Sequence, residues 1–202
     1  MDEQSWDARY RSRDRVFSGR PNAVLVAEAA DLPPGRALDA GCGEGADALW
    51  LARRGWQVTA VDIARTALER GAAAAAGADL PGRVAWTYGD LIAAPPPPGP
   101  YDLVSIHYVP LPRQADNAAL HALLATVAPG GTLLFATHAL AELSPRPEDG
   151  FDPADYYQPD DIAPLLDRHW KILVNGTRPR PAAAPDGTRH TRDAVLRARR
   201  PR

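Results

Sequence analysis

The sequence LDAGCGEGA at residues 38–46 decides the fold of this chain of 202 residues. It joins a short apolar run, which we expect to be a strand, to a helix expected over residues 46–54. Gly41, Gly43 and Gly45 let the backbone turn tightly and approach a ligand at places where a Cβ would clash. The first N–H groups of the following helix have no partner within that helix. A turn of this kind is typical of doubly wound α/β proteins, which bind ligands at the carboxyl ends of their strands.

Outward from this turn, apolar runs and helical patterns alternate along the chain. Helices are expected over residues 22–31, 46–54, 65–76, 114–127 and about 159–167. Strands are expected over residues 37–42, 56–61, 83–88, 102–107, 132–138, 171–176 and 194–199. This alternation predicts an α/β fold, a doubly wound, mostly parallel sheet of seven strands with helices on both faces.

We expect residues 1–202 to form a single domain, because no long linker divides the chain. An N-terminal segment, residues 1–21, precedes a core over residues 22–138. Residues 139–157 have no clear periodicity and are long for a connector, which favours a functional loop that contacts substrate. A closing helix and two strands occupy residues 158–202, and the proline-rich run at residues 94–100 is interpreted as a stiff connector.

The composition argues against several classes of protein. The net charge of -2 lacks the basic excess of a nucleic-acid binder, and the four arginines in the last six residues are interpreted as a solvated terminus. No apolar run approaches the ~18 residues of a membrane span, and the polar N-terminus lacks the apolar stretch of a signal peptide. Cys42 is the only cysteine, so we expect a cytoplasmic protein, a monomer or a weak homodimer. No histidines or cysteines have metal-site spacing, so no metal is expected.

Acidic residues lie within or shortly after three of the expected strands. Asp62 ends the second strand, 21 positions after Gly41, where a carboxylate can accept hydrogen bonds from both hydroxyls of a ribose. Asp90 can accept from an adenine amino group, although it is also suited to cap a helix. Asp39 would repel a pyrophosphate but suits the cationic end of a sulfonium amino acid. The glycine spacing alone also satisfies a dinucleotide fingerprint, so an NAD-dependent oxidoreductase stays open at this point.

Taken together, the motifs resemble those of the class I S-adenosylmethionine-dependent methyltransferases. LDAGCGEG resembles their motif I, VTAVDIA their ribose-binding turn, YGDL their adenine-binding turn, YDLVSIHYVPLP their fourth motif and LLATVAPGGTLLFATH their fifth-strand motif. The resemblance spans roughly residues 22–138 and is nearest to small bacterial members related to the tellurite-resistance and thiopurine methyltransferases. It implies S-adenosylmethionine as cofactor and in-line methyl transfer to a small-molecule nucleophile, either a thiol or another chalcogen, or an oxygen or nitrogen acceptor.

The resemblance also implies roles for individual residues. The segment WDARYRSRDRVFSGRPN at residues 6–22 is similar to one that folds over the cofactor, although a docked surface helix would also explain its pattern. Residues that resemble cofactor contacts are Tyr10, Arg15, Asp39, Gly41, Cys42, Gly43, Asp62, Ile63, Asp90, Leu91 and His107. Catalytic candidates are His107 and Tyr108, and substrate-side candidates are Trp6, Phe17, His138 and Tyr156.

His107 and His138 each end a predicted strand on the edge that carries the glycine turn. A histidine there suits a general base if the acceptor is protonated. Cys42 is interpreted as a small residue of the turn rather than a nucleophile, and Asp47 as a complement to the helix dipole. An isomerase or cyclase that uses the bound sulfonium only for its charge, and a non-catalytic binder of the cofactor, stay open as alternatives.

Overall fold

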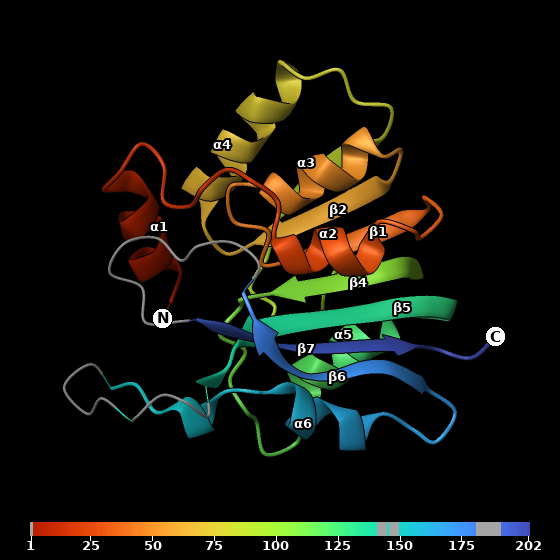
Figure 1. Ribbon diagram of the computed structural model, residues 1–202. Helices are drawn as coiled ribbons and strands as arrows, with labels where there is room; N and C mark the ends of the chain where they lie inside the picture. The colour runs from red at the N-terminus through yellow and green to blue at the C-terminus, as the bar shows by residue number, and fades with distance from the viewer. Residues whose placement is uncertain (1, 141–144, 146–149, 181–190) are drawn as a thin grey trace.

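The structure is a computed structural model that describes residues 2–140, 145, 150–180 and 191–202. Its centre is a seven-stranded sheet of order β3-β2-β1-β4-β5-β7-β6 (Figure 1). Strands β1 to β5 pair in parallel, and β7 is antiparallel to both β5 and β6. This confirms the predicted doubly wound, mostly parallel sheet. The strands are β1 (Arg36–Ala40), β2 (Gln57–Asp62), β3 (Arg83–Tyr88), β4 (Tyr101–His107), β5 (Val127–His138), β6 (Lys171–Pro179) and β7 (Arg192–Arg199).

Helices cover both faces of the sheet because successive strand residues point to opposite sides. On β5, Leu133 belongs to a buried cluster with Leu120, whereas the next residue, Leu134, belongs to a second cluster with Leu25. Figure 1 accordingly shows α2 in front of the sheet and α5 behind it. The helices are α1 (Glu3–Arg11), α2 (Ala23–Ala29), α3 (Ala46–Arg53), α4 (Arg65–Ala76), α5 (Ala118–Ala125) and α6 (Pro159–Ile162).

Two element boundaries differ from the sequence prediction. The helix expected over residues 114–127 is shorter, since α5 ends at Ala125 and β5 already begins at Val127. Gly130 has a φ of +79° and lies inside β5, where the pairing with β4 is irregular, so the Pro-Gly-Gly run bends a strand instead of ending a helix. The helix expected over 159–167 is only α6, followed by a 3-10 turn at Ala163–Leu165, because Pro164 has no N–H for a helical bond.

The structure describes the N-terminal segment from residue 2 onward, but it describes the predicted functional loop only in part. Residues 3–11 form α1, for which the sequence analysis left a docked helix open, and Figure 1 shows α1 on the side where the parallel strands end. Of the predicted loop 139–157, residues 141–144 and 146–149 lie outside the described residues. The described part contains a 3-10 turn, Pro153–Asp155, and a bridge between Pro112 and Tyr156.

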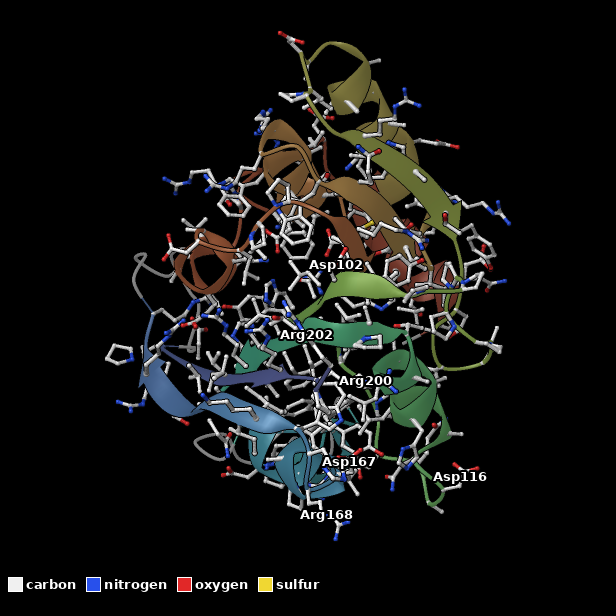
Figure 2. All side chains as sticks on the ribbon, turned by 90° about the vertical axis from the view of Figure 1, so that its right-hand side faces the viewer. Asp102, Asp116, Asp167, Arg168, Arg200 and Arg202 are labelled. Atoms are coloured by element: carbon white, nitrogen blue, oxygen red, sulfur yellow. The ribbon has the colours of Figure 1, made fainter. Side chains whose placement is uncertain are left out.

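The opposite edge of the sheet carries the basic C-terminal residues (Figure 2). Arg200 donates hydrogen bonds to the carbonyl oxygens of Ala125 and Val127, so this arginine ties the chain end to the start of β5. A hollow of about 450 Å³ lies there, lined by His169, Lys171, Arg199, Arg200, Pro201 and Arg202. This basic cluster therefore lies at the end of the sheet opposite to the glycine turn.

Candidate active site

The glycine turn lies at the carboxyl ends of the parallel strands. Gly41, Gly43 and Gly45 have φ values of +73°, +54° and +79°, a region that side chains rarely adopt. A Cβ on Gly41 would lie 2.2 Å from Cγ2 of Val109, and one on Gly45 would lie 2.2 Å from the ring of Trp86. Both the backbone conformation and the neighbouring side chains therefore require glycine here, as the sequence predicted.

Asp62 holds this turn against the end of β2. Its Oδ2 accepts a 2.7 Å hydrogen bond from the backbone N–H of Gly43, and its Oδ1 accepts one of 2.8 Å from that of Ala64. Burial raises the pKa of Asp62, although these backbone donors act in the opposite direction. The backbone N–H of Ile63 is a third donor, so of the about four acceptor positions of an ionised carboxylate Asp62 retains capacity for a ribose hydroxyl. Ile63 lies directly beside it at the end of the strand.

Asp39 is the buried acid beneath the turn. It is 2% exposed, and its Oδ2 has no hydrogen-bond partner within the described part of the chain. Burial, together with the charges of Asp47 and Asp62, raises the pKa of Asp39 well above its ordinary value. A buried carboxylate oxygen without a donor is costly, and a cationic ligand would compensate it. The amino group of a sulfonium amino acid therefore fits the residues present.

The N-terminal segment packs onto the glycine turn. The hydroxyl oxygen of Tyr10 lies 2.9 Å from the position that a Cβ on Gly43 would occupy, and the ring of Phe17 lies 3.8 Å from it. Tyr10 is buried and contacts Phe17 edge to face, with 6.1 Å between ring centroids. Trp6 packs on the other side of Tyr10, at 6.2 Å. The structure thus brings three of the predicted aromatic residues together above the turn.

Glu44, which the sequence analysis did not single out, fastens this segment. Its Oε2 accepts hydrogen bonds of 3.2 Å from the backbone N–H groups of Val16 and Phe17. Its Oε1 lies 2.9 Å from a guanidinium nitrogen of Arg70, and the same arginine donates to the carbonyl oxygen of Arg13. A glutamate in such a turn is not unusual. Nothing in the sequence therefore indicates that Glu44 contacts a segment 28 positions earlier.

Asp7 fastens α1 itself. Its Oδ1 accepts a 2.9 Å hydrogen bond from the backbone N–H of Thr66, at the start of α4, and its side chain also pairs with Arg11. The hydrogen bond from Thr66 is the main reason why the pKa of Asp7 is lowered. Both readings of the segment, a docked helix and a cover over the turn, are therefore compatible with its contacts.

His107 ends β4 and is 6% exposed. Its Nδ1 lies 2.9 Å from Oδ2 of Asp47 and 3.3 Å from Oγ of Ser105, while its Nε2 is buried and has no partner among the described residues. Asp47 also accepts two hydrogen bonds from Asn22, of 2.6 Å from the backbone N–H and 2.9 Å from the side-chain amide. Burial would raise the pKa of Asp47, but the hydrogen bond and charge of His107 and the donors of Asn22 lower it.

A second cluster lies next to His107 at the ends of β4, β5 and β6. Tyr108 has a φ of +55°, and strained backbone of this kind is often found at functional sites. Its ring lies 4.8 Å from that of His138 and 5.2 Å below the guanidinium of Arg180. Arg180 also lies 3.4 Å from the buried carboxylate of Asp193. Burial and the charge of Asp193 raise the pKa of Tyr108, so its hydroxyl stays protonated near neutral pH.

The remaining candidates have more ordinary surroundings. Asp90 accepts hydrogen bonds from the N–H groups of Ile92 and Ala93, which is the capping geometry that the sequence analysis weighed against adenine binding. Leu91 packs on the buried cluster around α5, and Arg15 lies against Gly19. Tyr156 stacks on Phe151 at 5.8 Å, in a contact separate from those of Tyr108 and His138. Burial raises the pKa of the Cys42 thiol, which argues against a nucleophilic thiolate.

Within the described ranges, no group of three or more histidine, cysteine, aspartate or glutamate side chains could hold a metal ion. The helices of those same ranges include none that is long and apolar enough to cross a membrane.

Comparisons with known proteins agree with this geometry. Residues 37–131 match the protein family described as a methyltransferase domain. The probable tocopherol O-methyltransferase, chloroplastic, of Oryza sativa subsp. japonica is 30% identical over 169 residues, which are 76% of this chain and 45% of that protein. The probable thiol methyltransferase 2 of Arabidopsis thaliana is 40% identical over 70 residues, 34% of this chain and 30% of that protein. The chain thus spans less than half the length of these relatives.

A solved structure has the same fold over nearly the whole chain. The N-methyltransferase NodS from Bradyrhizobium japonicum WM9, in complex with S-adenosyl-l-homocysteine, superposes with a TM-score of 0.73. The match covers 99% of this chain and 98% of that one at 18% sequence identity.

Proposed function

Because this chain belongs to the class I S-adenosylmethionine-dependent methyltransferases, we propose that it transfers the methyl group of S-adenosylmethionine to a small-molecule nucleophile. The observation that carries the proposal is the buried Oδ2 of Asp39 beneath the glycine turn, which has no partner among the residues that the structure describes. A pyrophosphate would be repelled by this carboxylate, whereas the amino group of the methyl donor would neutralise it. The family membership also decides against the NAD-dependent reading that glycine spacing alone left open.

The residues of the turn would each hold one part of the cofactor. Gly41 and Gly43 allow close approach of the backbone, Asp39 faces the amino group, and Asp62 accepts a hydrogen bond from a ribose hydroxyl. Asp90 and Leu91 are the candidates for the adenine. Phe17, whose backbone N–H is held by Glu44, and Tyr10, which packs against Phe17, would cover the site and exclude water.

When bound, S-adenosylmethionine supplies a methyl group on a positively charged sulfur, which a nucleophile displaces in line. The protein's own contribution is then mainly proximity and orientation, which can be worth about 7–11 kcal/mol. His107 is the candidate base for an acceptor that arrives protonated, and Tyr108 and His138 are the candidates for contacts with the acceptor. A base is not needed for an acceptor that is already ionised.

A small thiol or another chalcogen nucleophile is the acceptor that we favour. The support is the similarity to a relative named as a thiol methyltransferase and the resemblance of the motifs to chalcogen-methylating families. Oxygen and nitrogen acceptors are the alternatives that the experiment must separate. An isomerase or cyclase reaction without methyl transfer has no specific observation in its favour.

The test has two stages. Calorimetry should show binding of S-adenosylhomocysteine and none of NAD; the reverse result would refute the cofactor assignment. Mass spectrometry should then show S-adenosylhomocysteine and a methylated product when S-adenosylmethionine is mixed with one of a panel of small thiols, selenium and tellurium oxyanions, phenols and amines. Conversion of a panel member without formation of S-adenosylhomocysteine would indicate a reaction other than methyl transfer, and a thiol-only response would identify the acceptor class.

A further inference from the structure

Asp47 and His107 make specific contacts that an interaction of Asp47 with the helix dipole alone would not require. Asp47 comes from the first turn of α3 and His107 from the end of β4, 60 positions later, and both are buried. Two donors of Asn22 hold the carboxylate: the backbone N–H lies 2.6 Å from Oδ1 and the side-chain amide 2.9 Å from Oδ2. Oδ2 therefore faces Nδ1 of His107 at 2.9 Å in a fixed orientation.

This geometry determines which nitrogen of His107 carries the proton. An ionised carboxylate only accepts hydrogen bonds, so Nδ1 must be the donor in a contact of 2.9 Å. In the neutral ring Nε2 then has a free lone pair, and it is the buried atom without a partner among the described residues. Ile106, the residue before His107, pairs with Ala40 of β1, and His107 itself pairs with Ala136 of β5. His107 therefore lies at the strand ends beside the glycine turn.

We propose that Asp47 is a positioning residue that holds His107 in the Nδ1–H tautomer, so that Nε2 is the proton acceptor of the active site. This inference rests on the proposed function for its chemical step. In that step Nε2 takes the proton of an acceptor X–H, and the electron pair left on X forms the bond to the methyl carbon. The C–S bond breaks with its electrons going to sulfur, which becomes the neutral thioether, and the imidazolium is balanced by the Asp47 carboxylate.

Substitution Asp47→Asn should reverse the tautomer without removing a side chain. The backbone N–H of Asn22 must keep an oxygen at the Oδ1 position, so the new amide nitrogen is directed to the Oδ2 position. There it would donate to Nδ1 of His107, and the side-chain amide of Asn22 can turn its own oxygen toward it. The groups around Nδ1 remain paired, but His107 becomes Nε2–H and can no longer accept a proton at Nε2.

Nitrogen NMR of the ring of His107, in protein labelled with ¹⁵N-histidine, tests the tautomer without any acceptor. Two-bond correlations at pH 7.5, with saturating S-adenosylhomocysteine, should identify Nδ1 as protonated and Nε2 as unprotonated in the wild type. The same spectrum of Asp47→Asn should show the opposite assignment. Ser105→Ala removes the other polar group near Nδ1, at 3.3 Å, and should leave the wild-type tautomer. An Nε2–H tautomer in the wild type would overturn the proposal outright, whatever the folding of the variants.

Kinetics then test the consequence. For an acceptor protonated at the assay pH, Asp47→Asn should lower kcat by ~10²–10⁴-fold with little change in KM for S-adenosylmethionine. For an acceptor already ionised, the loss should shrink toward none. An unchanged kcat for the protonated acceptor, despite a reversed tautomer, would refute the role of His107 as the base. If the wild type shows the expected tautomer but methylates no acceptor, the proposed function fails and the Asp47–His107 assignment stands.

Discussion

Glu44 of the glycine turn accepts a 3.2 Å hydrogen bond from the backbone N–H of Phe17, in the N-terminal segment that packs onto the turn. The same carboxylate holds Val16 and pairs with Arg70. The conformation of the N-terminal segment is therefore coupled to the turn that is proposed to bind the cofactor.

Substitution Glu44→Ala should release this segment. We expect the affinity for S-adenosylhomocysteine to fall by about tenfold, or about 1.4 kcal/mol, as for the loss of hydrogen bonds to a charged group. Amide hydrogen exchange at residues 13–17 should become faster while the strands keep their protection. Glu69→Ala, which removes an exposed glutamate of α4, is the matched control and should change neither. Full affinity with rapid exchange would mean that the segment is only a docked helix.

Substitution Asp39→Asn should stabilise the unliganded protein and weaken cofactor binding. Burial raises the pKa of Asp39 in the folded state. The protonated side chain therefore contributes fully to the free energy of unfolding below the unfolded pKa of about 3.9, and this contribution is lost as the pH rises through the raised folded-state pKa. Above that window the buried charge destabilises the fold. The variant lacks this charge, so its Tm at neutral pH should exceed that of the wild type by about 2–4 °C for each kcal/mol relieved.

The difference in Tm between Asp39→Asn and the wild type should shrink as the pH falls, which differential scanning calorimetry at several pH values can measure. Its affinity for S-adenosylhomocysteine should fall by at least about tenfold, because the amino group loses its carboxylate. Asp31→Asn, at an exposed position, is the control and should leave both properties unchanged. A less stable Asp39→Asn protein with normal affinity would show that the acid is only a structural acceptor.

Substitution Asp62→Ala should weaken the binding of S-adenosylhomocysteine by one to two decades, roughly 1.4–2.7 kcal/mol. The reason is the loss of ribose contacts together with the loss of the bond to the N–H of Gly43. Asp102 offers the comparison, since it accepts a 2.8 Å hydrogen bond from the N–H of Arg36 at the opposite edge of the sheet (Figure 2). Asp102→Ala should lower the Tm without changing the affinity. Equal affinities for both variants and the wild type would place the ribose elsewhere.

The cluster around Tyr108 should act on the acceptor rather than the cofactor. We expect Tyr108→Ala and His138→Ala to raise KM for the acceptor by about tenfold or more, while calorimetry shows the affinity for S-adenosylhomocysteine within about twofold of the wild type. His121→Ala removes an exposed histidine of α5 and serves as the control. Loss of cofactor affinity in Tyr108→Ala would instead assign this ring to the cofactor site.

The fold and the position of the glycine turn could be predicted from the sequence. Local patterns are sufficient for this, because strand and helix periods, the glycines at 41, 43 and 45, and the acids Asp39 and Asp62 are each readable within a short stretch of sequence. Of the two exceptions one is local, because Pro164 shortens a helix. The other is not, because Gly130 lies in a strand that is extended by the pairing of Val127 with Tyr101, which local propensity does not contain.

The side chains that meet at the site, by contrast, could not be predicted without the three-dimensional arrangement of the chain. Asp47 and His107 are 60 positions apart, Glu44 and Val16 are 28 apart, and no spacing rule joins a helix start to a strand end or to a preceding segment. Their contacts arise because the parallel strands end at one edge and the chain crosses that edge several times. Within the described part of the chain, Oδ2 of Asp39 and Nε2 of His107 are buried without partners, and this burial is created by the whole fold and by no single stretch of sequence.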